Sequence, residues 1–121
     1  MRKEEVEDLF SPITPVTIKR MFGGLGVYRD GLMFALVAYG ELFLKVDDET
    51  RAAFEEAGSS PFVYDGGKKP ITMSYWRLPD DAYDDPDVLS EFAHLAFGAA
   101  HRAGSKKTRK RSSRSKAALP Q

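Results

Sequence analysis

Hydrophobic and polar residues alternate over much of the chain with the two-residue period of β-strands. The longest alternating stretch, GVYRDGLMFALVAYGELFLKVD, is divided into three short strands by the pairs Asp30-Gly31 and Tyr39-Gly40. Two-residue turns of this kind join antiparallel neighbours, so the pattern predicts a meander. We expect strands at residues 16–22, 25–29, 32–38 and 41–46, then a second hairpin formed by SSPFVYDGG and a main strand at 71–78.

Three further segments have the period of amphipathic helices, and we expect them at residues 3–10, 48–58 and 86–103. Asp47-Asp48 can cap the second helix, and Gly58 ends it. Asp85-Pro86 opens the third, whose apolar face is wide enough to lie across the sheet. The order helix, four strands, helix, two strands, helix predicts an α+β fold. We expect an antiparallel sheet of five to six strands with helices packed on one face.

The glycine-rich stretch RMFGGLGVYRDG at residues 20–31 could be a phosphate cradle or a place where the backbone bends. A dinucleotide-binding loop needs a third glycine where this chain has Arg29, and it opens a helix rather than a strand. The Lys-Ser/Thr pair of a P-loop is also missing. We therefore expect Gly23 and Gly24 to permit a positive φ or a bulge between two strands.

Candidate catalytic and metal-binding residues are few. The chain has no cysteine, which excludes disulfides, thiolate metal sites and cysteine nucleophiles. His94 and His101 are separated by about 10.5 Å along a helix, too far for one metal ion. Five acids between Asp80 and Asp87 are explained by helix capping better than by a cation site. We expect no catalytic residue, no metal and no cofactor.

Charge divides the chain into two parts. All 18 acidic residues lie at or before Glu91, whereas eight of the 18 basic residues lie at or after Arg102, so the net charge of zero separates into −8 and +8. The segment after Gly104 has one leucine and no aromatic residue, and it cannot bury enough apolar surface to become ordered. We expect a folded domain at residues 1–103 and a disordered basic tail at 104–121.

The basic tail is the clearest functional signal in the sequence. Seven cations within eleven residues can neutralise phosphates and release counterions, which predicts sequence-independent binding to DNA. A tail that only improves solubility, or that contacts the anionic domain of its own chain, explains the same pattern. The candidate nucleic-acid-binding residues are Lys106, Lys107, Arg109, Lys110, Arg111, Arg114 and Lys116.

A second candidate surface lies on the open face of the predicted sheet. Basic and aromatic residues alternate with apolar ones on several strands, and Phe43, Met33 and Val37 on or near this face suggest a partner or a second copy of the chain. A solvated sheet face explains the basic residues equally well. The residues assigned to this surface are Arg20, Lys45, Tyr75 and Arg77.

Four stretches of the chain resemble the TfoX N-terminal domain family: RMFGGLGVYRDGLMFAL, ELFLKVDDETRAAF, PFVYDGGKKPITMSYWRLP and DPDVLSEFAHLAFGAAHRA. The resemblance implies a compact α+β domain. It also implies a link to the regulation of natural competence and DNA transformation in bacteria, in a family not known for catalysis. The competence regulators carry a second, helical domain where this chain has its basic tail. The motif residues are Met21, Phe22, Gly23, Gly24, Gly26 and Tyr28.

These patterns together predict a non-enzymatic regulatory or interaction protein that contacts DNA through its tail. A regulatory protein and a second copy of the chain are the other expected partners. Acids near the N-terminus and the lack of a membrane-length apolar run predict a cytoplasmic protein with no membrane contact. One alternative is a homodimerising module without a nucleic-acid role, and another is a small-ligand-binding or hydrolytic domain.

Overall fold

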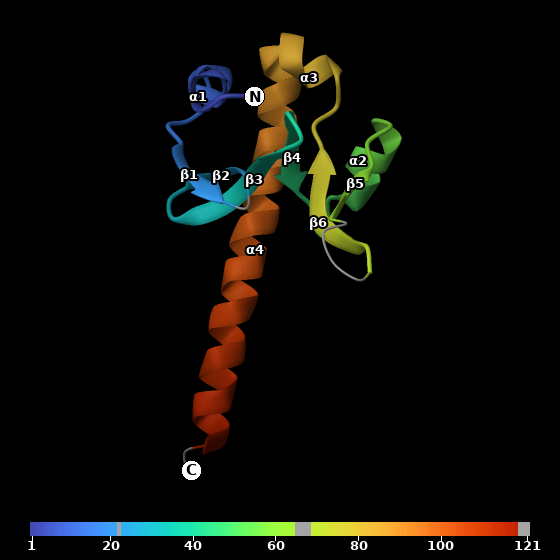
Figure 1. Cartoon of the computed structure of the whole chain (residues 1–121). Coiled ribbons are helices and arrows are strands. Elements are labelled where there is room, and N and C mark those ends of the chain that lie inside the picture. Colours follow the sequence, from blue (N-terminus) through green and yellow to red (C-terminus); the bar gives the residue numbers. More distant parts are fainter. Residues whose placement is uncertain (22, 65–68, 119–121) are drawn as a thin grey trace.

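The computed structural model of the chain describes residues 1–21, 23–64 and 69–118; for Ile71 and residues 105–118 it describes the backbone and not the side chains. The described part contains helices and strands in the predicted order, with one short helix, α3, in addition (Figure 1). The elements are α1 (Lys3–Phe10), β1 (Thr17–Met21), β2 (Gly24–Arg29), β3 (Leu32–Ala38), β4 (Glu41–Lys45), α2 (Arg51–Glu56), β5 (Pro61–Tyr64), β6 (Ile71–Arg77), α3 (Asp81–Asp84) and α4 (Pro86–Ala118).

The strands form one antiparallel sheet in the order β1-β2-β3-β4-β6-β5. Asp30-Gly31 and Tyr39-Gly40 connect the strands of the meander, and all four residues have positive φ, between 52° and 80°. Left-handed backbone at both positions of a two-residue turn matches the right-handed twist of the paired strands. The predicted meander is therefore confirmed.

The glycine-rich stretch is a hairpin between β1 and β2, as predicted. Gly23 has φ +77°, which L-residues rarely adopt. A Cβ on Gly24 would lie 2.0 Å from the carbonyl oxygen of Val37 on the neighbouring strand. These glycines serve a turn and a close backbone approach, and the neighbouring Phe22 lies outside the described residues.

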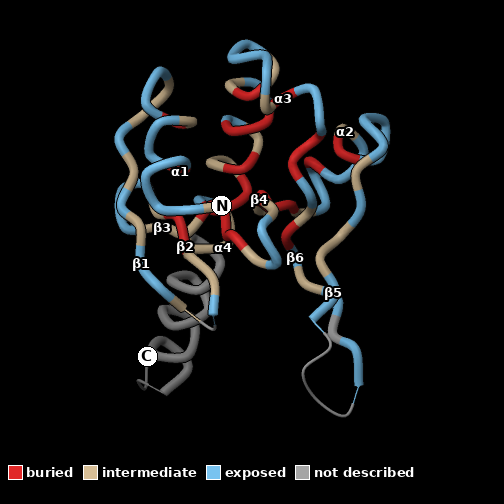
Figure 2. The backbone as a smooth tube through the Cα atoms, turned by 45° about the horizontal axis from the view of Figure 1, so that its top comes forward, coloured by how far each residue is buried: buried red, intermediate tan, exposed pale blue. Residues whose placement is uncertain are grey.

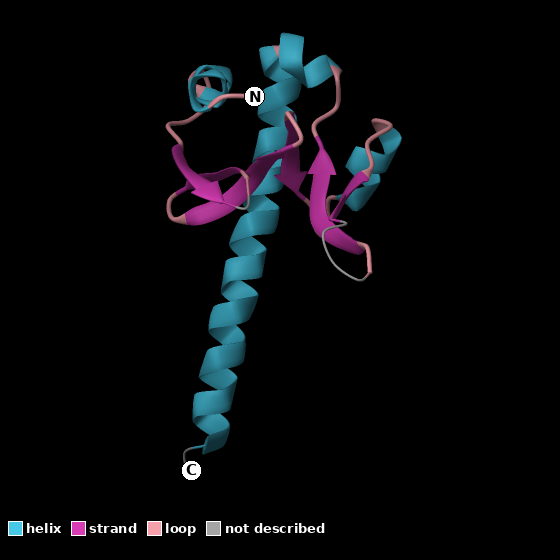
Figure 3. Cartoon of the chain, viewed as in Figure 1, coloured by secondary structure: helices cyan, strands magenta, loops and turns pink. Residues whose placement is uncertain are grey.

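The helices pack against one face of the sheet, called here the inner face, and α4 crosses behind the strands in Figure 3. Phe34 of β3 is central: its ring makes edge contacts with Phe10 of α1 and Phe97 of α4, at centroid distances of 5.2 and 4.7 Å. Phe54 of α2 packs in the same way on Phe92 of α4. Figure 2 shows the buried positions concentrated in the centre of the molecule, which confirms the predicted layering.

Two helix boundaries differ from the prediction. Helix α2 begins at Arg51, after a turn at residues 48–50 in which the Asp47 carboxylate accepts a hydrogen bond from the Glu49 N–H, while the same carboxylate also binds Arg102. Helix α4 begins at Pro86, where Asp85 accepts a hydrogen bond from the N–H of Val88, as the N-cap prediction required. Its backbone continues as helix to Ala118 instead of ending near residue 103. No proline interrupts this stretch, and Ala, Lys and Arg are good helix formers. Disorder of residues 104–121 in the free protein stays a prediction.

Candidate interaction surfaces

The sheet face opposite the helices, called here the outer face, has its own small apolar cluster. Leu36, Phe43 and Tyr75 are buried at its centre. The side chains packed around them are Met33, Ala38, Phe62 and Met73. The outer face is therefore covered by its own side chains. Of the four residues assigned to the predicted interaction surface, Tyr75 belongs to this cluster, and Lys45 and Arg77 are register partners of its members Tyr75 and Phe43.

Lys45 and Tyr75 are register partners on β4 and β6. The Lys45 ammonium lies 5.0 Å from the centre of the Tyr75 ring and donates a hydrogen bond of 2.6 Å to the Ser74 hydroxyl. The Tyr75 hydroxyl donates to the Met33 carbonyl at 3.4 Å. Burial raises the pKa of Tyr75 to about 12, with a smaller contribution from Tyr28. Tyr75 is thus a neutral, packed residue that supports a cation on its ring.

Arg77 forms an ion pair with Glu41 across the same face. Both side chains are about half exposed, at 50% and 43%. The charge of Arg77 is compensated, so this position adds little net positive potential to the outer face.

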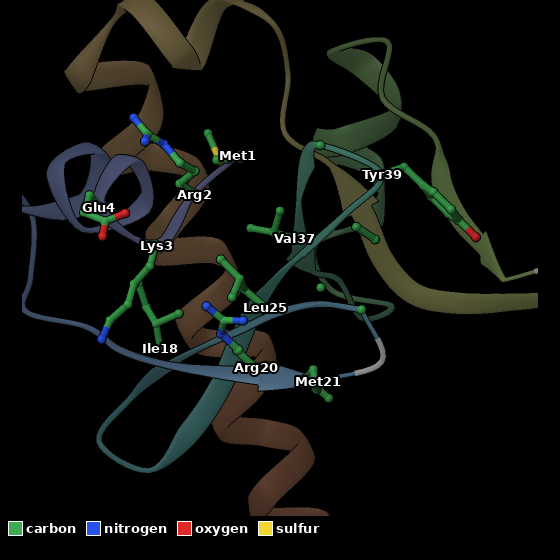
Figure 4. A pocket seen from close by; sticks show the side chains of 14 residues that line it. Met1, Arg2, Lys3, Glu4, Ile18, Arg20, Met21, Leu25, Val37 and Tyr39 are labelled. Atoms are coloured by element: carbon green, nitrogen blue, oxygen red, sulfur yellow. The ribbon is translucent and has the colours of Figure 1, made fainter.

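Arg20 lies on the inner face and does not join Lys45, Tyr75 and Arg77. Strand alternation places it with Ile18, which packs against the inner core, and its register partner is Leu25. The predicted four-residue surface is therefore divided between two faces. Val37, expected on or near the same surface, is also on the inner face, where it is buried in the core. Arg20 instead lines a groove of about 910 Å³ near the N-terminus, which the sequence did not reveal (Figure 4).

The tail residues predicted to bind nucleic acid lie in the part of α4 whose side chains are outside the described residues. These residues are Lys106, Lys107, Arg109, Lys110, Arg111, Arg114 and Lys116. The last described cation before them is Arg102. Its guanidinium donates to Asp47 at 2.6 and 3.1 Å and pairs with Glu49 at 2.7 Å.

The hydrogen bond from Arg102 is the main cause that lowers the pKa of Asp47, and the same bond raises the pKa of Arg102. This contact fixes α4 to the connection between β4 and α2. Sequence reasoning missed it, because no local pattern connects two residues 55 positions apart.

The histidine His94 and the acidic cluster at residues 80–87, considered above as metal ligands, have structural explanations. Within the described residues, no group of three or more His, Asp or Glu side chains could hold a metal ion. His94 is exposed and its Nδ1 lies 2.7 Å from the Ser90 carbonyl one turn earlier. Asp85, in the acidic cluster, caps α4. None of the described helices has the length and apolar character to cross a membrane.

Comparison with known proteins agrees with the fold and the motifs. A model of the TfoX N-terminal domain matches residues 8–100, which is well over half of the chain. The DNA transformation protein TfoX1 of Aliivibrio fischeri is 34% identical over 62 residues, which cover 51% of this chain and 30% of that protein. The chain thus matches less than a third of the length of this curated relative. The extent of the family match shows that the chain belongs to the TfoX N-terminal domain family.

Proposed function

We propose that this protein is a non-enzymatic, competence-related regulator in the bacterial cytoplasm. It contacts nucleic acid without sequence preference through the cations of residues 104–121. The observation that carries this proposal is the charge division: seven cations lie within eleven residues of the tail, whereas every acidic residue lies at or before Glu91. A polyanion is thereby attracted to one end of the chain and repelled by the rest.

The spacing of the tail cations suits a phosphate backbone. In the sequence, Lys106, Lys110 and Arg114 follow one another at intervals of four residues. Each phosphate that a cation neutralises releases condensed counterions, which gives affinity that falls with salt and is independent of base sequence. The tail has no aromatic residue, so base stacking does not contribute.

The contacts of Arg102 give this tail a fixed origin. Its guanidinium is tied to Asp47 and Glu49, so the cations of the tail begin close to a point that is anchored to the folded domain. Those two carboxylates are occupied by Arg102 and are less available to compete for the tail.

The polar side chains of the outer face already have partners within the chain, and this supports a non-enzymatic role. Lys45 is bound to Ser74, Tyr75 is buried and neutral at ordinary pH, and Arg77 is paired with Glu41. A catalytic acid, base or nucleophile needs access to substrate and a pKa matched to its task. The regulatory part of the proposal is supported by the family match and by the name of the Aliivibrio fischeri relative, a DNA transformation protein.

Fluorescence anisotropy with two labelled DNA duplexes of unrelated sequence tests this function. The full chain is compared with a variant in which the seven tail cations are glutamine, and with the control Arg51→Gln, which removes an exposed cation from the domain. We expect the seven-glutamine variant to bind both duplexes at least about tenfold more weakly, and the control to bind as the native chain does. Equal binding by the tail variant, or a strong preference for one duplex, would contradict the proposal.

A second candidate function is self-association through the outer face. It is favoured by the apolar cluster on this face, which no described helix covers, and by the exposure of Tyr39 and Tyr64, which adjoin it. Analytical ultracentrifugation over a wide concentration range tests it. If the outer face mediates self-association, we expect the sedimenting species to change from monomer to dimer as the protein concentration rises. A monomer at all concentrations would rule out this function.

A further inference from the structure

Helix α4 is one uninterrupted helix that continues well beyond the folded domain. It spans Pro86–Ala118, 33 residues, which corresponds to a length of about 50 Å at the rise of an α-helix. Its first part packs on the inner face of the sheet, and its last part extends past the sheet with no other described element beside it (Figure 1, Figure 3). This projecting part is residues 105–118, and it includes the seven cations of the tail.

The point at which the helix leaves the domain is held by two contacts. The Arg102 guanidinium binds Asp47 and Glu49 in the connection between β4 and α2. The β2–β3 hairpin also approaches the helix closely, because a Cβ on Gly104 would lie 3.2 Å from Cδ2 of Leu32. The projecting part therefore follows a formed helical turn that is anchored to the domain.

An anchored turn makes it easier for the following residues to be helical. Starting a helix fixes several residues for a single hydrogen bond, whereas each residue added to an existing helix gains a hydrogen bond of its own. Nine of the fourteen residues from 105 to 118 are Ala, Lys or Arg, which are good helix formers. Cations also interact favourably with the dipole at the C-terminal end of a helix. The anchor and the sequence thus favour a helix that continues through the tail.

Repulsion between the cations opposes this helix in the free protein. Lys106 and Lys110 are four residues apart, as are Lys107 and Arg111, and like charges at this spacing destabilise a helix. No acidic residue follows Glu91 to compensate them. A bound polyanion removes this repulsion, so binding of the polyanion and formation of the helix support each other.

The dimensions of a helix select one kind of polyanion. An α-helix with its side chains is about 10–12 Å across, and the major groove of B-form DNA, about 12 Å wide, admits it. The major groove of double-stranded RNA is too deep and narrow for this, and a single strand has no groove. Phosphates of both DNA strands border the major groove, so a helix rich in cations meets negative charge on both sides.

The projecting geometry also separates bound DNA from the acidic domain. Residues 1–101 have 10 basic and 18 acidic residues, a net charge of −8. Residues 105–118 extend about 21 Å along the helix axis, whereas the Debye length at physiological ionic strength is about 8 Å. Solvent and salt therefore screen most of the tail from the domain, and DNA bound there escapes most of its repulsion.

We propose that residues 105–118 bind B-form DNA as a helix that is continuous with α4 and lies in the major groove. This inference rests on the proposed nucleic-acid role of the tail. It adds the conformation of the bound tail and a preference for duplex DNA over duplex RNA and single strands, neither of which follows from charge alone.

The test breaks the helix without changing its charge. The helix-breaking variant is Thr108→Pro/Ser112→Pro, because proline removes a backbone hydrogen bond and clashes with the preceding turn in a helix interior. The matched control is Thr108→Ala/Ser112→Ala, which places the best helix former at the same two positions. Both variants are made in the full chain, where these positions lie beyond the anchor at Arg102. Thermal melts confirm that the domain folds in each.

Fluorescence anisotropy measures binding to a DNA duplex, to an RNA duplex of the same sequence and to the DNA single strand. We expect the proline variant to bind the DNA duplex about tenfold more weakly than the alanine control, and the two to bind the RNA duplex and the single strand equally. The alanine control should prefer the DNA duplex over the other two. Equal affinity of the two variants for the DNA duplex, or an equal loss on all three nucleic acids, would overturn the proposal.

Two further measurements address the bound conformation and the groove. In far-ultraviolet circular dichroism with saturating DNA duplex, the alanine control should have a stronger helical signal than the proline variant. A duplex with bulky C5 substituents on its thymines, which project into the major groove, should bind the alanine control more weakly than the unmodified duplex does. Equal helical signals, or an unchanged affinity for the substituted duplex, would contradict a helix in this groove.

The two proposals fail in different ways. If the tail does not bind nucleic acid, replacing its seven cations with glutamine leaves the affinity for the DNA duplex unchanged. If the tail binds without forming a helix, the seven-glutamine variant binds more weakly, while the proline variant and the alanine control bind equally.

Discussion

Arg102 of helix α4 donates two hydrogen bonds to the carboxylate of Asp47, with Nε 2.6 Å from Oδ2 and Nη2 3.1 Å from Oδ1. The same Nε lies 2.7 Å from Glu49. A guanidinium held on both oxygens of one carboxylate has a defined orientation as well as a favourable energy. Because Asp47 follows β4 and Arg102 precedes the basic tail, this contact determines how the tail leaves the folded domain.

Replacement of Arg102 by glutamine should lower the free energy of unfolding by about 1–2 kcal/mol, because both partners are partly shielded and the contact is bidentate. Urea denaturation followed by circular dichroism measures this change. The matched control is Arg51→Gln, which removes an exposed pair with Asp48 and should cost less than about 0.5 kcal/mol. Equal effects of the two substitutions would show that the Arg102 contact has no special structural role.

Acid should weaken the same contact. The hydrogen bond from Arg102 holds the pKa of Asp47 below its usual value of 3.8, so the folded state binds this proton less readily than the unfolded state does. The resulting stability is present above the unfolded pKa and is lost as pH falls through the folded pKa. Urea midpoints measured from neutral pH down to about pH 2 should therefore fall less steeply in Arg102→Gln than in the native chain. Parallel curves would contradict this assignment.

Gly24→Ala should destabilise the protein more than Gly23→Ala. A Cβ at position 24 would meet the Val37 carbonyl oxygen at 2.0 Å, and backbone cannot move aside without disturbing the pairing of β2 and β3. We expect a loss of about 2–3 kcal/mol. At Gly23 the space is open and only the positive φ is unfavourable, which costs about 1 kcal/mol. Thermal melts of the two variants compare these costs, and the reverse order would contradict the described hairpin.

Tyr75 should lose its proton late in an alkaline titration of the folded domain. Burial raises its pKa from 10.0 to about 12, so the folded state retains the proton over a range in which the unfolded state releases it. The stability that Tyr75 provides is complete below pH 10 and is lost as pH rises towards about 12. Ultraviolet titration of tyrosinate should show a late step that is missing in Tyr75→Phe. Loss of an early step in that variant would contradict the burial of Tyr75.

The features that the sequence predicted depend on local physical signals. Asp30-Gly31 reveals one turn because both residue types tolerate left-handed backbone, and Gly40 reveals the second, in which Tyr39 also has a positive φ. Asp85 reveals the start of α4, because its carboxylate accepts a hydrogen bond from an N–H of the first turn. Strand alternation correctly separated Lys45 from its apolar neighbours on β4.

The features that the sequence did not predict depend on distant contacts. Arg20 was assigned to the outer face because alternation gives the relative phase within β1 but not which face the helices cover. The contact between Arg102 and Asp47 joins two elements 55 positions apart, so no local pattern indicates it. The groove joins residues 1–4 to two hairpin turns, and no single segment contains a signal for it.

The central claim is that the cations of residues 104–121 bind nucleic acid through its phosphates. The most direct measurement is the slope of the logarithm of the duplex binding constant against the logarithm of salt concentration, for the full chain and the seven-glutamine variant. Each contacted phosphate contributes about −0.9 to this slope, so we expect the native slope to be steeper by about 4 to 6. Equal slopes and equal affinities in the two proteins would contradict the claim.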